Sequence, residues 1–193
     1  MEIYLARHCE TDWNKIRKVQ GRTNIPLNEE GIKQAKKLGE LLNDISFDKC
    51  YVSPLTRTQE TASYITTLSP IIDDRIIERS FGDLEGQENV EAAIMESIMN
   101  FNKDPYNTEP LIDVFERTKR FIDEVINDTS NNILIISHGG AFKGLHYNLI
   151  GYDDTTDFLD FRLLNGEVCK YTIENGQVTN FEIINQKKDT IFH

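Results

Sequence analysis

The sequence predicts an α/β protein built on a mostly parallel central sheet, and three patterns carry that prediction. Residues 1–6 and 132–137 are short apolar segments that end abruptly in polar residues, as buried strands do. Segments with apolar residues at helical spacing lie between the predicted strands. The last third of the chain instead alternates apolar and polar residues around Asn-Gly pairs, which is typical of antiparallel hairpins. We therefore expect a three-layer sandwich, with helices on both faces of the sheet and an antiparallel C-terminal edge.

The first half of the chain contains clear helix and strand signals. Asn28 is a good helix cap, and Glu29-Glu30 places two acids against the positive end of the helix dipole. The apolar face of this helix would contain Ile32, Ala35, Leu38, Leu41, Leu42 and Ile45. Residues 48–53 then form a short predicted strand, and Ser53-Pro54 is expected to cap and begin the next helix.

An insertion is predicted in the middle of the chain. Pro70-Ile71-Ile72 precedes a polar loop that runs to Gly86. Residues 87–102 then carry apolar side chains at roughly helical spacing, bounded by a polar, proline-containing stretch. We expect a small helical lid over about residues 87–112 that is not part of the sheet.

The remaining elements complete the sandwich. Amphipathic patterns predict helices over residues 113–128 and 141–150, on either side of the central strand 132–137. The C-terminal meander is expected to consist of strands over residues 158–164, 167–173 and 178–184, with turns at Asn165-Gly166 and Asn175-Gly176.

Composition limits the function classes. A chain of 193 residues is most simply a single domain, residues 1–193, and its 39% apolar and 27% charged residues are ordinary for a globular protein. The net charge of −11 argues against nucleic acid or an anionic membrane as a partner. No apolar run reaches the roughly 20 residues of a membrane span. The first residues lack the basic-then-apolar pattern of a secretion signal, since Glu2 and Arg7 interrupt it, and the three cysteines form no disulfide or metal-ligand pattern. We therefore expect a cytoplasmic protein.

Basic residues stand where predicted strands end. Arg7-His8 follows the first strand, His138-Gly139 follows residues 132–137, and Arg57 lies at the start of the helix after residues 48–53. The carboxyl ends of parallel strands share one edge of a sheet, so these side chains should converge. Arginine matches phosphate oxygens bidentately, and a helix N-terminus attracts anions. The sequence therefore predicts a pocket for a phosphoryl group.

These residue types suggest a specific chemistry. A neutral His8 could attack phosphorus, and nearby arginine charge should lower its pKa and favour that form. Arg7, Arg57 and a cationic or donating His138 could stabilise the transferring group without a metal. The leaving alcohol would need a proton from a carboxylic acid on the loop above the pocket, where Glu78 and Glu85 are the candidates.

Five segments, in order, resemble the histidine phosphatase superfamily, in the branch similar to phosphoglycerate mutase. They are Arg7-His8-Cys9-Glu10-Thr11 with Asn14, Gln20-Gly21, Ser53–Ala62, Glu78 with Glu85-Gly86, and Ser137-His138-Gly139-Gly140. The resemblance covers residues 1 to about 150. It implies the fold predicted above and a phosphatase or phosphoryl-transfer activity.

The resemblance also implies roles for single residues. His8 would be the phosphorylated nucleophile and Glu78 the proton donor and acceptor. Arg7, Arg57 and His138 would hold the phosphoryl group, and Asn14 and Gln20 would assist at its edge. Gly21 and Gly139 are further candidates for phosphate binding, and Gly139-Gly140 would let the backbone approach the ligand closely. Cys9 stands where the family usually has glycine. We expect this thiol either to narrow the pocket or, if exposed and acidic, to make the site sensitive to oxidation.

Three functions stay open at this point. The first is a metal-independent, cofactor-free phosphatase that passes the phosphoryl group from His8 to water. The second is a mutase, and the third is a non-catalytic protein that binds a phosphorylated ligand. The short insertion favours hydrolysis, because a mutase must enclose its intermediate. Only Lys103 is basic between Gln87 and Glu116, which favours a small phosphomonoester such as ribazole phosphate, a sugar phosphate or phosphoserine. The C-terminal edge leaves a homodimer possible.

Overall fold

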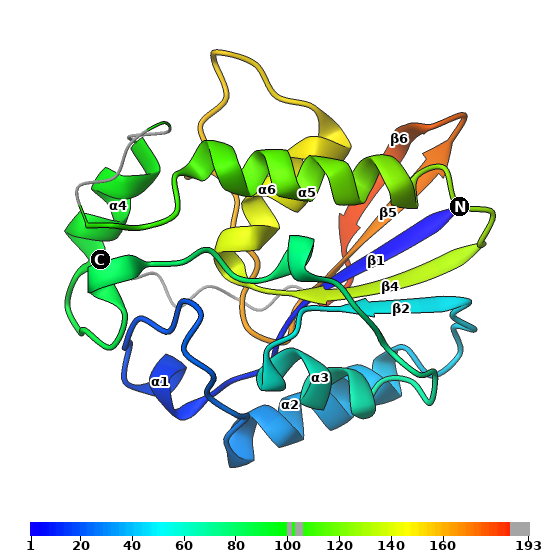
Figure 1. The fold of residues 1–193 in the computed structure, drawn as a ribbon. Helices are drawn as coiled ribbons and strands as arrows, with labels where there is room; N and C mark the ends of the chain where they lie inside the picture. The colour runs from blue at the N-terminus through cyan, green and yellow to red at the C-terminus, as the bar shows by residue number, and fades with distance from the viewer. Residues whose placement is uncertain (100–101, 103–105, 186–193) are drawn as a thin grey trace.

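The computed structural model describes residues 1–99, 102 and 106–185. Their strands form one six-stranded sheet in the order β3-β2-β4-β1-β5-β6, with helices on both faces (Figure 1). The strands are β1 (Glu2–Arg7), β2 (Lys49–Val52), β3 (Ile71–Ile72), β4 (Asn132–Ser137), β5 (Val168–Glu174) and β6 (Gln177–Ile183). The first four run parallel, whereas β5 pairs antiparallel with β1, and β6 pairs antiparallel with β5. The predicted α/β sandwich with an antiparallel edge is confirmed.

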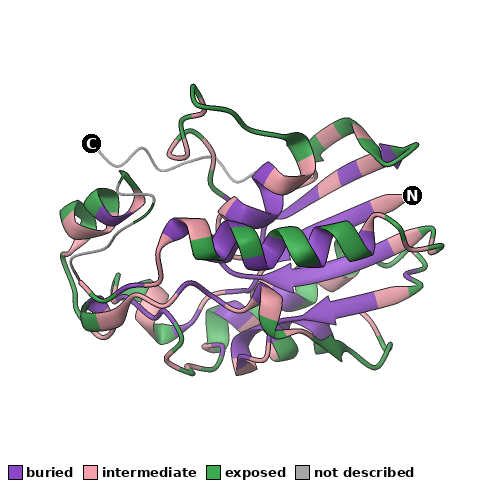
Figure 2. Cartoon of the chain, turned by 45° about the horizontal axis from the view of Figure 1, so that its top comes forward, coloured by how far each residue is buried: buried purple, intermediate pink, exposed green. Residues whose placement is uncertain are grey.

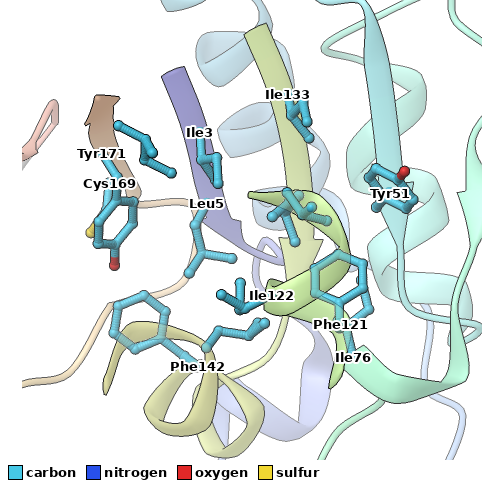
Figure 3. Close-up of a cluster of buried hydrophobic side chains, with 14 of the residues drawn as sticks. Ile3, Leu5, Tyr51, Ile76, Phe121, Ile122, Ile133, Phe142, Cys169 and Tyr171 are labelled. Atoms are coloured by element: carbon cyan, nitrogen blue, oxygen red, sulfur yellow. The ribbon is translucent and has the colours of Figure 1, made fainter. Parts of the chain in front are cut away.

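One face of the sheet packs against α5 (Leu111–Val125) and α6 (Gly139–Ile150). Side chains alternate between faces along a strand, so Ile3 and Leu5 of β1 reach this layer together with Ile133 of β4 (Figure 3). The helices contribute Phe121, Ile122, Val125, Phe142 and Leu145 to the same cluster. The central strands are buried on both faces, and α5 exposes only its outer stripe (Figure 2).

The opposite face packs against α2 (Glu29–Leu41) and α3 (Thr56–Ser63). The Asn28 side chain accepts a hydrogen bond from the Gly31 N–H at 2.8 Å, which confirms the predicted cap of α2. The prediction that Ser53-Pro54 caps and begins α3 is wrong. The N-cap of α3 is Leu55, without a side-chain cap, because the Ser53 hydroxyl is engaged with a buried histidine instead.

Short elements lie at the end of the sheet where β1 and β4 finish. A four-residue helix, α1 (Asp12–Lys15), follows β1, and α4 (Glu91–Met99) lies beyond the strand ends (Figure 1). Two 3₁₀ helices, η1 (Asp74–Ile76) and η2 (Gly82–Leu84), shape the loop between β3 and α4. The predicted lid helix over 87–102 is thus shorter, and residues 100, 101 and 103–105, including Lys103, lie outside the described residues.

The C-terminal edge differs from the predicted meander. The turn at Asn165-Gly166 exists, but residues 158–164 form no strand. The physical reason is that β5 already has β1 on one side and β6 on the other, so no free edge is left for a third partner. The segment turns to the end of β1 instead, where the Arg7 side chain donates to the Leu163 carbonyl at 2.8 Å. Among the described residues, no helix is both long and apolar enough to span a membrane.

Candidate active site

A cavity of about 660 Å³ opens at the carboxyl ends of β1 and β4. Most residues that the sequence predicts for the site line it together: Arg7, His8, Asn14, Gln20, Gly21, Arg57, Glu78 and Gly139. His138 does not line the cavity and lies behind it, with its ring centre 5.2 Å from that of His8. The four basic residues Arg7, His8, Arg57 and His138 therefore lie close together at the ends of the strands, as predicted.

His8 is held by a hydrogen bond at Nδ1, which leaves its Nε2 with a lone pair. Its side chain is 2% exposed, and Nδ1 lies 2.7 Å from the Cys9 carbonyl oxygen. A carbonyl oxygen can only accept, so Nδ1 carries the hydrogen of a neutral ring and Nε2 keeps its lone pair. Burial lowers the His8 pKa well below its ordinary value, and the charges of Arg57 and Arg7 lower it further. Burial, rather than arginine charge alone, keeps this ring neutral.

Arg57, His138 and Ser53 form a buried chain of hydrogen bonds. Arg57 Nε donates to His138 Nδ1 at 3.2 Å, and His138 Nε2 lies 2.7 Å from the Ser53 hydroxyl. Because an arginine nitrogen always donates, His138 is a neutral ring with its hydrogen on Nε2. Burial also lowers the His138 pKa well below its ordinary value. In this geometry both of its nitrogens are used within the protein, and its direct effect is to orient Arg57.

The Arg57 guanidinium is fixed at two further points. Its Nη1 donates to the Thr23 carbonyl at 3.0 Å and its Nη2 to the Gly21 carbonyl at 2.7 Å. Gly21 has a φ of +49°, which favours glycine, and a Cβ there would also collide with the Glu85 carboxylate. The side chain is 1% exposed, and burial lowers its pKa to about 10, which still leaves it charged at neutral pH.

Arg7 has a donor without a partner. Its Nη1 bonds the Leu163 carbonyl, but its Nε is the one buried side-chain nitrogen or oxygen, within the described part of the chain, that makes no hydrogen bond. A buried unsatisfied donor costs free energy, so such a group points to a ligand. The start of α6 lies against it, since a Cβ on Gly139 would come within 3.1 Å of Arg7 Cζ.

The structure separates the two candidate proton donors. Glu78 lines the cavity, and its Oε1 accepts from the backbone N–H of Arg79 at 2.8 Å and of Ala141 at 2.9 Å. Its Oε2 accepts a single bond, from Gly140 N–H at 3.2 Å, which leaves this oxygen room for a proton. Glu85 does not line the cavity. Its carboxylate accepts from Arg22, Thr23 and Phe81 and so ties two loops together.

The amide residues near His8 are held as donors toward the cavity. The Asn14 Oδ1 accepts from the Thr11 backbone at 3.1 Å and from Asn165 Nδ2 at 3.3 Å, so its Nδ2 is the group available to a ligand. Gln20 is orientated in the same way, because its Oε1 accepts from the Thr11 hydroxyl at 2.9 Å. Thr11 also caps α1, which explains the turn directly after the Arg7-His8 pair.

Sequence reasoning missed several residues that line the cavity. Asn165, predicted only as a turn residue, donates to the His8 backbone carbonyl at 3.0 Å and so holds the segment that follows β1. Four further basic residues line the cavity, Arg17, Lys18, Lys143 and Arg162, together with the acidic Glu91. Burial lowers the pKa of Lys143 to about 8, and its amine is bonded to backbone carbonyls. The pattern around strand ends could not reveal these residues, because they come from a loop, a helix interior and the misassigned segment 158–164.

Cys9 does not affect the cavity in either of the expected ways. Its side chain is 0% exposed and packs with Leu27 and Ala35, and the residue does not line the cavity. The expectations of a narrowed pocket and of an exposed, oxidisable thiol are therefore wrong. Within the described residues, no three or more His, Cys, Asp or Glu side chains are grouped as metal ligands.

Comparisons with known proteins identify the family of this chain. The family model of the histidine phosphatase superfamily (branch 1) matches residues 3–186. The phosphatase PhoE of Bacillus subtilis is 35% identical over 89% of this chain and 87% of its own. Phosphoserine phosphatase 1 of Hydrogenobacter thermophilus is 33% identical over 79% of this chain and 78% of its own. The crystal structure of the α-ribazole phosphatase of Shigella flexneri superimposes with a TM-score of 0.82 and 30% identity, covering 96% of each chain.

Proposed function

Because the chain belongs to the histidine phosphatase superfamily, we propose that it hydrolyses a small phosphomonoester through a phosphohistidine on His8. Phosphatase activity is supported at the level of the family by its relatives. The observation that carries the finer proposal is the hydrogen bond from His8 Nδ1 to the Cys9 carbonyl, which leaves Nε2 as the nucleophilic atom.

In the first step, the phosphoryl group lies among the donors of the cavity. Arg7 and Arg57 supply positive charge, and Asn14, Gln20 and the Gly139 backbone add hydrogen bonds at its edge. His8 Nε2 forms a bond to phosphorus while the bond to the ester oxygen breaks. Glu78 Oε2 gives its proton to that oxygen, so the leaving group departs as an alcohol. The two guanidinium groups stabilise the equatorial oxygens, which allows the step to proceed without a metal.

In the second step, water attacks the phosphohistidine. The water oxygen bonds to phosphorus while Glu78, now ionised, takes a proton from that water. The bond between phosphorus and His8 Nε2 breaks. Inorganic phosphate leaves and both residues return to their starting state. His138 supports both steps by holding Arg57 in the required orientation.

Two alternatives compete with this proposal. A mutase would return the phosphoryl group to the substrate, which requires enclosure from water, and the nine-residue α4 offers little cover. A non-catalytic binding protein would have no use for a carboxylate placed in the cavity as Glu78 is. Both observations favour hydrolysis.

The cavity narrows the substrate class. Its lining combines the buried cations Arg7 and Arg57 with apolar side chains, which are Phe81, Val90, Ile94, Ile98 and Leu163. The four further basic residues of the lining also allow a second anionic group, such as a carboxylate, although the predicted lid itself is poor in basic residues. Phosphoserine, ribazole phosphate and sugar phosphates therefore all belong in a substrate panel.

Phosphate release from 4-nitrophenyl phosphate in the presence of a chelator tests the proposal. We expect turnover in the wild-type protein and none with His8→Ala. Turnover that survives His8→Ala, or that requires an added divalent metal, would contradict the mechanism. Isomerisation of 3-phosphoglycerate, measured on the same preparation, should be negligible, and a faster isomerisation than hydrolysis would establish the mutase.

A further inference from the structure

Arg79 links the predicted proton donor to α4. Its backbone N–H donates to Glu78 Oε1 at 2.8 Å, and its side chain is 1% exposed and does not line the cavity. There Nη1 donates to the Ser97 hydroxyl at 3.1 Å and Nη2 to the Ser97 carbonyl at 3.2 Å. A single residue therefore contacts both the Glu78 carboxylate and the last turn of α4.

The far end of this link is anchored in the segment that leads into α5. Arg79 Nε donates to the Glu109 carbonyl at 2.7 Å, and Nη2 donates to the Thr108 hydroxyl at 3.1 Å. The Ser80 carbonyl accepts from the Glu109 N–H at 2.9 Å, so the loop that carries Glu78 and the segment around Glu109 are joined on both sides of the arginine. Arg79 thus connects its own loop to α4 and to the segment around Glu109 through buried hydrogen bonds.

One side of α4 contacts both the cavity and Arg79. Ile94 and Ile98 line the cavity, whereas Ser97 is buried and turned to Arg79. Substrate that packs against the isoleucines would press on the same helix that Arg79 holds. Glu78 has little freedom to adjust, because its carboxylate accepts from the backbone N–H groups of Arg79, Gly140 and Ala141. A small displacement of the arginine would therefore move the carboxyl group out of reach of the leaving oxygen.

We propose that Arg79 is a positioning residue, which places Glu78 for proton transfer only when α4 is docked through Ser97. This inference rests on the proposed role of Glu78 as proton donor. Its consequence is that contacts between the leaving group and α4 influence protonation of that leaving group as well as binding. Arg79 would not touch the phosphoryl group or His8.

The test uses kcat/KM, which reports the steps up to departure of the alcohol, for two substrates. 4-Nitrophenyl phosphate has a leaving group that needs no proton, whereas an alkyl phosphate such as glycerol phosphate does. We expect Arg79→Met to lower kcat/KM about 30–100-fold for the alkyl ester and less than about threefold for the aryl ester. Arg79→Lys should lower kcat/KM for the alkyl ester by less than Arg79→Met does. Ser97→Ala should lower kcat/KM for the alkyl ester about 3–10-fold and again affect the aryl ester less.

Controls separate this inference from the proposed function and from general damage. Ser80→Ala alters the same loop, but within the described residues the Ser80 hydroxyl makes one hydrogen bond, accepted from Gly82 N–H at 3.3 Å, so both esters should react at the wild-type rate. Glu78→Gln should give the strongest discrimination between esters. This inference alone would be overturned if Glu78→Gln discriminates between the esters but the other three variants do not. In that case Arg79→Met, Arg79→Lys and Ser97→Ala would each lower kcat/KM equally for both esters. If Arg79→Met does not fold, Ser97→Ala decides. Absence of discrimination with Glu78→Gln would overturn the proton-donor role and this inference together.

Discussion

Arg57 Nε lies 3.2 Å from His138 Nδ1, and this contact fixes both partners. The guanidinium can only donate, so the imidazole must present a lone pair at Nδ1 and its hydrogen at Nε2, where Ser53 lies 2.7 Å away. A second histidine beside a phosphate site could have been expected to act as a cation. The structure instead gives it the role of an acceptor that turns the Arg57 plane toward the cavity.

Ser53→Ala tests this chain without touching the cavity. The substitution leaves the buried His138 Nε2–H without an acceptor, which should lower the free energy of unfolding by about 1–3 kcal/mol. It should also reduce kcat/KM on both aryl and alkyl phosphates, because the orientation of Arg57 is lost. Urea unfolding and phosphate release measure the two effects. Ser63→Ala is the matched control on exposed α3 surface, and a Ser53→Ala protein as active as this control would show that the chain does not matter.

Glu85→Gln should behave differently from Glu78→Gln. The Glu85 carboxylate accepts bonds from three backbone N–H groups of Arg22, Thr23 and Phe81, and the amide nitrogen of glutamine cannot replace one of its oxygens as an acceptor. We expect a loss of about 1–3 kcal/mol in unfolding free energy, with equal decreases in rate for aryl and alkyl esters. A selective loss on alkyl esters would transfer the proton-donor role to Glu85.

Two neighbouring glycines should give different defects when changed to alanine. A Cβ at Gly139 would come within 3.1 Å of Arg7 Cζ, whereas one at Gly140 would come within 2.6 Å of Glu78 Oε1. Gly139→Ala should therefore slow both esters, since it displaces a phosphate-binding group. Gly140→Ala should lower kcat/KM for the alkyl ester at least about tenfold more than for the aryl ester, because it displaces the Glu78 carboxyl group. The same substrate profile for both variants would contradict these assignments.

Stability should decrease at mildly acidic pH because the fold keeps histidines neutral. Burial is the first cause of the lowered pKa of His8 and His138, and it lowers that of His146 to about 4. Below about pH 6.5 the unfolded chain takes up protons that the folded chain does not. The free energy of unfolding should then fall by about 1.4 kcal/mol per pH unit for each ring.

Urea unfolding between about pH 7 and pH 5 measures this slope. His146→Gln removes one titrating ring that does not line the cavity. The slope of the unfolding free energy against pH should then decrease by about 1.4 kcal/mol per pH unit. The ring lies 2.8 Å from the Tyr171 hydroxyl, so some stability is also lost at every pH. A slope that does not change with this substitution, or a stability that rises toward pH 5, would contradict the assignment.

The sequence was most informative where a strand ends in a motif. The apolar runs of β1 and β4 and the residues after them were enough to predict that Arg7, His8 and Arg57 converge. The prediction failed for residues 158–164, because alternation and an Asn-Gly turn describe a hairpin but not whether a sheet edge is free to accept it. The role of Ser53 was also out of reach, since a helix-cap pattern says nothing of a histidine 85 residues away. Arg79 was similarly hidden, because its side-chain partners, Ser97 and the Thr108–Glu109 pair, come from two other segments of the chain.

Trapping the covalent intermediate tests the central claim most directly. The protein is mixed with a fast aryl phosphate, denatured in alkali within the first turnover, and digested for mass spectrometry, with phosphorus NMR to identify the nitrogen. We predict one phosphoryl group on His8 at Nε2 and none in His8→Ala. Phosphate on another side chain, or full turnover without any phosphoenzyme on this time scale, would contradict the account.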